Sequence, residues 1–138
     1  MAHNQYVLDS YAILALLNDE SGAERVASLI KQAADPHHVV AMSLINLGEV
    51  AYIVERRWGI EKTQIVLAYL EATGIHFVEV EKNHVLDAAH LKAKYPIAYT
   101  DAFAAALAIE MEATLLTGDP EFQALFSHLD IEWLATAS

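Results

Sequence analysis

The chain of 138 residues contains no cysteine, only five glycines and three prolines, and only eight lysines and arginines against 19 aspartates and glutamates. The lack of cysteine excludes disulfides, thiolate catalysis and cysteine-ligated zinc, and it fits a reducing cytoplasm. So few glycines leave no glycine-rich phosphate loop, which argues against a nucleotide-binding domain. No apolar run approaches the roughly 20 residues of a membrane helix, and residues 1–10 do not have the pattern of a signal peptide. We therefore expect a soluble, cytoplasmic protein.

The formal net charge of -11 disfavours broad binding to nucleic acid. It remains compatible with an acidic site that collects metal ions and with a basic partner protein. Hydrophobic residues make up 55% of the chain, so we expect part of the apolar surface to lie in a homodimer or partner interface. The length fits a single domain over residues 1–138.

Hydrophobic periodicity predicts strands that alternate with helices along the chain. The expected strands cover 6–8, 38–42, 75–80, 113–117 and, more weakly, 131–134; the expected helices cover 10–17, 23–34, 44–58, 61–73, 82–94 and 100–112, with a short one starting at Asp119-Pro120. Parallel strands need crossover connections, and helices provide them. The prediction is an α/β three-layer sandwich, in which helices flank a mostly parallel central sheet of about five strands.

Four acids lie in apolar segments, where a carboxylate is unexpected: Asp9, Glu49, Asp101 and Asp119. Three of them have an ordinary alternative role at a helix start, because Asp9 and Asp119 can act as caps and Asp101 can interact with the helix dipole. Glu49 lies in the middle of a predicted helix. The alternative role for Glu49 is an ion pair with Arg56 or Arg57, which would require a long reach back along the helix.

The expected fold brings the acids together, because ligands of open α/β sheets bind beyond the carboxyl ends of the strands. Two ionised carboxylates about 4 Å apart repel by about 4 kcal/mol at an effective dielectric near 20. Such a cluster needs protons or a metal. Ligands that are all oxygen favour Mg²⁺ or Mn²⁺, and the chemistry that suits such an ion is phosphodiester hydrolysis.

Four segments of the sequence, VLDSYAILALL, SLINLGEVAYIVERR, YTDAFAAALAIEM and LLTGDPEF, resemble in order and separation the PIN-domain ribonucleases, and within them the VapC-like toxins of type II toxin-antitoxin systems. The resemblance covers nearly the whole chain. It implies that the four acids are the catalytic and metal-binding residues for Mg²⁺ or Mn²⁺, with Ser10, Thr100 and Thr117 as supporting hydroxyls. It also implies a homodimer, cleavage of structured RNA, and inhibition by a cognate antitoxin.

Cations cluster locally only at Arg56, Arg57 and Lys62. These residues are candidates for binding RNA phosphates, and their alternative role is a solvated helix end that suits the dipole. Two other functions compete with that of a ribonuclease. A phosphorylated receiver domain would need an adjacent acidic pair early in the chain and a lysine after the 113–117 strand, whereas here Asp9 is followed by Ser10 and no lysine follows that strand. A catalytically quiet PIN-like module that only binds a partner remains the alternative.

Overall fold

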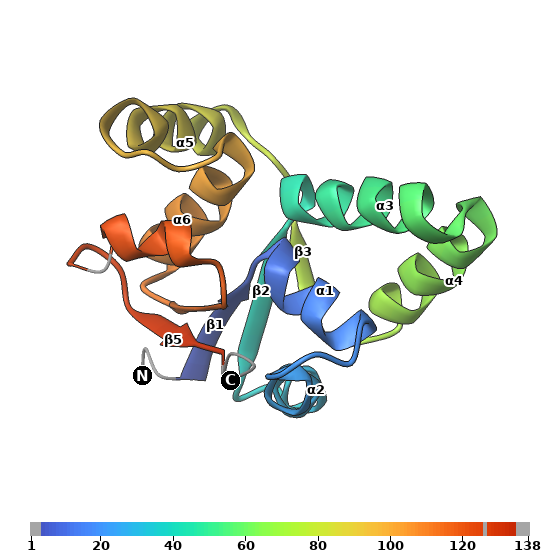
Figure 1. Cartoon of the computed structure of the whole chain (residues 1–138). Helices are drawn as coiled ribbons and strands as arrows, with labels where there is room; N and C mark the ends of the chain where they lie inside the picture. Colours follow the sequence, from blue (N-terminus) through green and yellow to red (C-terminus); the bar gives the residue numbers. More distant parts are fainter. Residues whose placement is uncertain (1–3, 126, 135–138) are drawn as a thin grey trace.

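The computed structural model describes residues 4–125 and 127–134 and contains one five-stranded sheet (Figure 1). The strands run in the order β3-β2-β1-β4-β5, and every neighbouring pair is parallel. The elements in chain order are β1 (Gln5–Leu8), α1 (Ser10–Leu17), α2 (Ala23–Gln32), β2 (Val39–Ser43), α3 (Leu44–Trp58), α4 (Ile60–Glu71), β3 (His76–Val78), α5 (Lys82–Lys94), α6 (Tyr99–Met111), β4 (Thr114–Thr117), the 3-10 helix η2 (Pro120–Leu125) and β5 (Ile131–Trp133). The predicted α/β sandwich is confirmed.

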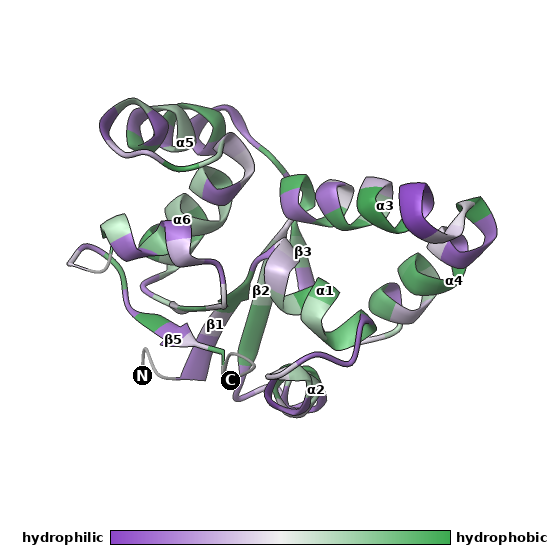
Figure 2. Cartoon of the chain, viewed as in Figure 1, coloured by the Kyte–Doolittle hydropathy of each residue, from purple (hydrophilic) through white to green (hydrophobic). Residues whose placement is uncertain are grey.

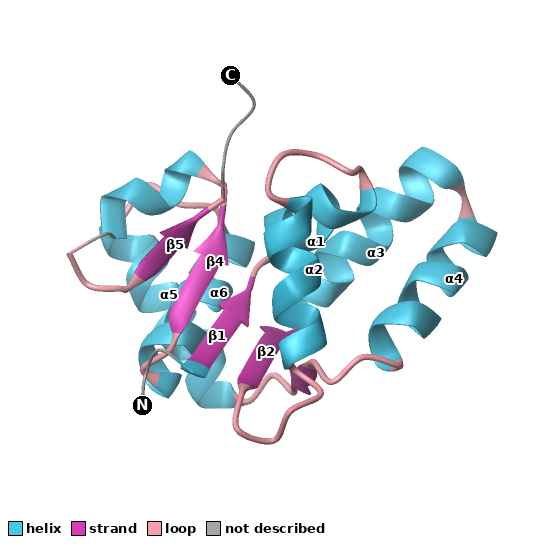
Figure 3. Ribbon diagram, turned by 90° about the horizontal axis from the view of Figure 1, so that it is seen from below, coloured by secondary structure: helices cyan, strands magenta, loops and turns pink. Residues whose placement is uncertain are grey.

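Helices cover both faces of the sheet, which gives three layers (Figure 3). Side chains alternate between the faces along each strand. Leu8 and Leu116 pack with residues of α1, α2, α3 and α4, whereas Val7 and Leu115 pack with residues of α5, α6 and η2. Because both faces are covered, a strand can be apolar along nearly its whole length, and Figure 2 shows this for β2.

Local signals in the sequence explain where α3 begins and ends. Ser43 is the last residue of β2 and caps α3, since its hydroxyl accepts a hydrogen bond from the Ile45 amide at 3.2 Å. Gly59 ends the helix with φ +91°, a conformation that favours glycine. The helix predicted over 44–58 between these two residues has the same bounds as α3.

The apolar run in α6 differs from the prediction at one end. The sequence predicts burial on nearly all sides from Ala102 to Ile109, and residues 102–108 are buried. Ile109 is 41% exposed, however, so the buried run ends one residue earlier than predicted. None of the helices in the two described ranges is long and apolar enough to cross a membrane.

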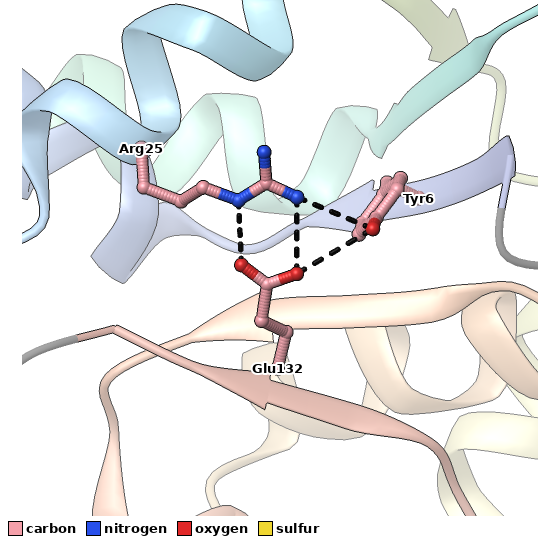
Figure 4. Close-up of polar contacts among 3 residues, drawn as sticks. All are labelled: Tyr6, Arg25 and Glu132. Atoms are coloured by element: carbon pink, nitrogen blue, oxygen red, sulfur yellow. Dashed lines mark hydrogen bonds and ion pairs between the residues drawn. The ribbon is translucent and has the colours of Figure 1, made fainter.

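A polar clamp fixes the edge strand β5 to the rest of the sheet (Figure 4). Arg25 on α2 donates two hydrogen bonds to the Glu132 carboxylate, at 2.6 Å from Nε and 3.1 Å from Nη2. Its Nη2 also donates to the Tyr6 hydroxyl at 3.2 Å, and that hydroxyl donates to Glu132 Oε1 at 3.4 Å. The Arg25 side chain holds the pKa of Glu132 below its ordinary value. The clamp therefore joins β1, β5 and α2 across the intervening strand β4.

Removing the arginine of this clamp should weaken the fold modestly. We expect Arg25→Met to lower the free energy of unfolding by about 1 kcal/mol, because each charged side chain is 35% exposed and water screens the pair. The effect should shrink in acid, as Glu132 becomes protonated and the pair loses its charge. Urea unfolding measures the difference, and Lys31→Met on the same helix is the control. Equal losses in the two variants would contradict a specific role for the clamp.

Candidate metal centre

The four acids of the sequence pattern come from four different elements around the carboxyl ends of β1 and β4. Asp9 directly follows β1 and caps α1, where its Oδ1 accepts from the Ala12 amide at 2.9 Å. Asp119 follows β4 by two residues, Asp101 lies in the first turn of α6, and Glu49 lies in the middle of α3. The crossover helices of a parallel sheet thus bring residues from distant parts of the chain to one edge.

The structure brings Asp101 and Asp119 together, in a group that also includes Glu121. One carboxylate oxygen from each residue can be chosen so that all three lie within 4.8 Å of one another. Glu121 was not among the predicted site residues. The signal that points to it is its spacing, because it lies two residues after Asp119 in the turn that forms η2, and its amide donates to Asp119 Oδ1 at 2.9 Å.

Hydroxyl groups orient the two acids outside this group. The Thr117 hydroxyl donates to Asp9 Oδ2 at 2.5 Å, and the Thr117 hydroxyl oxygen accepts from the Asp119 amide at 3.0 Å. Ser10 donates to one oxygen of Glu49, and Thr100 donates to the other at 3.2 Å. The three hydroxyl residues predicted to support the site therefore all contact a site carboxylate or its backbone.

Gly118 allows close packing in the turn between Thr117 and Asp119. A Cβ atom at this position would lie 2.3 Å from the Tyr11 ring. The ring of Tyr11 thus rests directly on the backbone that carries Asp119, which only glycine permits without displacement.

A second buried polar contact joins α3 to α6. The Asn46 amide nitrogen donates to the Thr100 carbonyl oxygen at 3.0 Å. Asn46 is fully buried, and its Oδ1 has no hydrogen-bond partner among the described residues. An unsatisfied buried acceptor costs about 1–3 kcal/mol. This asparagine therefore reduces the stability of the fold relative to an apolar residue of similar size.

Burial and mutual repulsion raise the pKa of two of the acids. Burial, with a further contribution from the nearby Asp119 charge, raises the pKa of Asp9 from 3.8 to about 7, although hydrogen bonds from Thr117 and Ala12 oppose the shift. Burial and the neighbouring carboxylates, Asp119 foremost, raise the pKa of Asp101 from 3.8 to about 8. Near neutral pH this site therefore holds protons that a divalent cation could replace.

No lysine or arginine within residues 4–125 and 127–134 forms an ion pair with a site carboxylate. Glu49 in particular has no contact with Arg56 or Arg57, which are exposed. The alternative of an ion pair for Glu49 is therefore absent from the described part of the chain. The donor set, made of carboxylate oxygens without a cationic partner, suits a hard divalent cation such as Mg²⁺ or Mn²⁺.

The role of the Thr117 hydroxyl can be tested with an isosteric change. In Thr117→Val the Asp9 carboxylate loses a donor, and the Asp119 amide loses its acceptor. We expect Mn²⁺ affinity to fall by about tenfold, the size typical of losing a residue that orients a metal ligand. Calorimetric titration measures the affinity, and Thr114→Val on the same strand is the control. Parent-like affinity in Thr117→Val would show that the hydroxyl does not orient the site.

Comparison with known proteins places this geometry in a family. The PIN domain model matches residues 6–125, and no curated protein sequence gives a significant match. Among solved structures, a chain of VapBC2 from Rickettsia felis, bound to a DNA fragment from its promoter, is similar with a TM-score of 0.73 and 20% identity, over 95% of this chain and 99% of that chain. VapBC-1 from nontypeable Haemophilus influenzae matches with a TM-score of 0.69 and 23% identity, over 94% and 97%.

A third similar structure is VapC20 of Mycobacterium tuberculosis, which is described as a toxin that cleaves the sarcin-ricin loop. It matches with a TM-score of 0.68 and 19% identity, over 86% of this chain and 93% of that chain. At these identities the structures establish a common fold. The family model covers most of the chain, and the protein therefore belongs to the PIN domain family.

Proposed function

We propose that this protein is a metal-dependent endoribonuclease and the toxin of a type II toxin-antitoxin pair. The observation that carries the proposal is the convergence of carboxylates, two of them buried and none paired with a lysine or arginine among the described residues, at the carboxyl edge of a PIN-domain sheet. Asp9, Glu49, Asp101 and Asp119 would hold Mg²⁺ or Mn²⁺, and Glu121 is a further oxygen donor in reach. The bound ion would supply polarisation of the phosphate and a more acidic water.

The residues of the chain have distinct roles in this proposal. Asp9 is held by Thr117 and the α1 backbone, so its position is fixed before the ion binds. Glu49 is oriented by the hydroxyls of Ser10 and Thr100. Asp101 would release its proton on binding the ion, because its pKa of about 8 applies to the protein without metal. Prior orientation of this kind reduces the rearrangement needed during the reaction.

A cleavage assay tests the proposed function directly. We expect the parent protein to cut RNA with Mn²⁺ or Mg²⁺ and to be inactive in EDTA. Glu49→Gln keeps the shape and removes the charge, so it should slow cleavage by about 100-fold, which corresponds to roughly 3 kcal/mol of lost stabilisation of the transition state. If correctly folded Glu49→Gln cuts as fast as the parent, the proposed site is wrong.

RNA would reach the acidic site with help from the cations at the α3–α4 corner. Arg56 and Arg57 lie at the end of α3, Lys62 lies at the start of α4, and all three are exposed. The guanidinium groups lie over the rings of Tyr52 and Trp58, at 5.1 and 4.9 Å from the ring centroids. These positive charges would offset the net charge of -11 where phosphate binds.

We expect the double variant Arg56→Gln, Arg57→Gln to raise KM for RNA by about tenfold, while kcat stays near the parent value. These residues would add binding that is equal in the ground and transition states. Steady-state kinetics at several salt concentrations measure both parameters. Lys92→Gln, Lys94→Gln on α5 removes the same charge elsewhere. An equal rise in KM for that control would show that net charge, not the α3–α4 corner, governs RNA binding.

An antitoxin partner and a homodimer belong to the same proposal. A cavity of about 220 Å³ between α1 and α3, with Tyr11, Leu14, Ile53 and Trp58 among its lining residues, could receive apolar side chains of the antitoxin. The net charge of -11 suits a partner with a basic segment. The similar structures include VapBC2 from Rickettsia felis, VapBC-1 from nontypeable Haemophilus influenzae and a toxin-antitoxin complex from Klebsiella pneumoniae. We place the protein in the cytoplasm.

A catalytically quiet module that only binds its partner is the alternative. Exposed apolar side chains on α3 and α4, such as Tyr52, Ile60 and Ile65, favour partner binding in either case. The two functions differ in the metal site. A protein that binds a partner but binds no Mn²⁺ at millimolar concentration would support the quiet module.

A further inference from the structure

Asn46 lies on α3 one turn before Glu49, and the two residues make reciprocal contacts with the start of α6. The Asn46 amide donates to the Thr100 carbonyl oxygen at 3.0 Å. The Thr100 hydroxyl donates back to Glu49 Oε2 at 3.2 Å. Residues three apart share a helix face. One face of α3 is therefore hydrogen-bonded to Thr100 of α6 at both the backbone and the side chain of Thr100.

Thr100 is next to a carboxylate of the candidate metal site. Thr100 precedes Asp101, and both lie in the first turn of α6. No side chain caps this helix at Ala98, and Glu121 Oε1 accepts from the Ala98 amide at 2.8 Å. Together with the Thr100–Glu49 bond, the bond from Asn46 helps to fix where α6 begins, and hence where Asp101 stands relative to Glu49.

An asparagine at position 46 stabilises the fold less than an apolar side chain would. The orientation of its amide is determined, because the Thr100 carbonyl can only accept and so must face the nitrogen. This leaves Oδ1 buried without a partner among the described residues. A leucine, which branches at the same Cγ and is somewhat larger, would fill the space without this unsatisfied acceptor. Residues that reduce stability in this way are typical of functional sites.

We propose that Asn46 is a positioning residue of the carboxylate site, which sets the distance between Asp101 and Glu49 by holding the first turn of α6 against α3. It need not contact the ion or the RNA itself. The inference rests on the proposed metal site. It extends that site to a neutral amide whose contribution is geometric.

The test uses Asn46→Leu, with metal affinity and stability measured separately. We expect the metal-free variant to unfold at the same temperature as the parent or higher, because the unsatisfied acceptor is gone. Its Kd for Mn²⁺ should rise by at least tenfold, the lower end of the range for residues that orient metal ligands. Its kcat for RNA cleavage should fall with little change in KM. Asn83→Leu, at an exposed position on α5, is the control and should change neither affinity nor kcat.

Two results would overturn the proposal. One is parent-like Mn²⁺ affinity in a folded Asn46→Leu protein. The other is a loss of stability that accounts for the loss of affinity, which would make Asn46 a purely structural residue. If leucine prevents folding, the smaller Asn46→Ser is used with the same measurements, and failure of both variants to fold also counts against the proposal.

The parent protein separates this inference from the proposed function. A parent that binds Mn²⁺ and does not cut RNA would overturn the ribonuclease proposal, and the affinity of Asn46→Leu would still decide the role of Asn46. A parent that binds no Mn²⁺ would overturn both, and calorimetry of the parent shows this before any variant is made.

Discussion

Asp101→Asn is expected to reduce metal-dependent RNA cleavage by about a thousandfold, which corresponds to about 4 kcal/mol of lost transition-state stabilisation. The same change should stabilise the metal-free protein. Asp101 is buried beside other acids, and this raises its pKa to about 8, so above that pH the folded protein must hold an unfavourable charge. Asparagine removes the charge and keeps the shape. Initial cleavage rates and urea unfolding in EDTA measure the two effects.

The opposite signs of these effects make the prediction specific. Asp87→Asn, on the exposed surface of α5, is the matched control and should alter neither rate nor stability appreciably. If Asp101→Asn lost activity and stability together, a role for Asp101 in the fold would explain the result equally well. If it kept full activity, Asp101 would not belong to the metal site.

The stability of the metal-free protein should fall as the pH rises from about 4 to about 8. Asp9 has a pKa of about 7 in the folded protein against an ordinary value of 3.8, so the folded state holds its proton more tightly than the unfolded state does. Stability from such a group is fully present below the ordinary pKa and is lost as pH rises through the folded pKa. The shift corresponds to about 4 kcal/mol for Asp9, and Asp101 adds a contribution of the same sign.

Thermal unfolding across this pH range, in EDTA and with saturating Mn²⁺, measures the effect. Mn²⁺ should raise the unfolding temperature more at the higher pH, because its ligands must be deprotonated. The double variant Asp9→Asn, Asp101→Asn should show a much flatter pH dependence, since asparagine can still cap α1 at position 9. A metal-free parent that is as stable at about pH 8 as at about pH 5 would contradict the raised pKa values.

Most of the fold could be predicted from the sequence, because its signals are local. Helices α1, α3 and α5 agree with their predicted bounds, and strong boundary signals such as Ser43 and Gly59 explain the case of α3. The errors lie at element ends. The strand predicted over 75–80 is shorter in the structure, where only His76–Val78 pair with β2. Ile75 is buried although it lies before the paired residues, and the chain leaves the sheet edge after Val78. Apolar alternation does not show where pairing stops.

The site could be predicted only in part, because a carboxylate in an apolar segment is a local anomaly and a contact between distant residues is not. Asp9, Glu49, Asp101 and Asp119 were recognisable in this way. Glu121 could not be recognised by this criterion, since it is exposed and lies in a polar turn. Its place beside Asp101 depends on how η2 approaches α6. The bond from Asn46 to the Thr100 backbone spans 54 residues of sequence. Only the tertiary packing of α3 on α6 reveals it.

Calorimetric titration of the metal-free protein with Mn²⁺ near pH 7, in two buffers of different ionisation enthalpy, tests the central claim that the carboxylates form a divalent-metal centre. Asp9 and Asp101 carry protons near this pH, so the binding of the ion must release protons to the buffer. We predict saturable binding whose measured heat depends on the buffer, and loss of that binding in Asp101→Asn. An absence of saturable binding at millimolar Mn²⁺, or binding that Asp101→Asn leaves intact, would contradict the account.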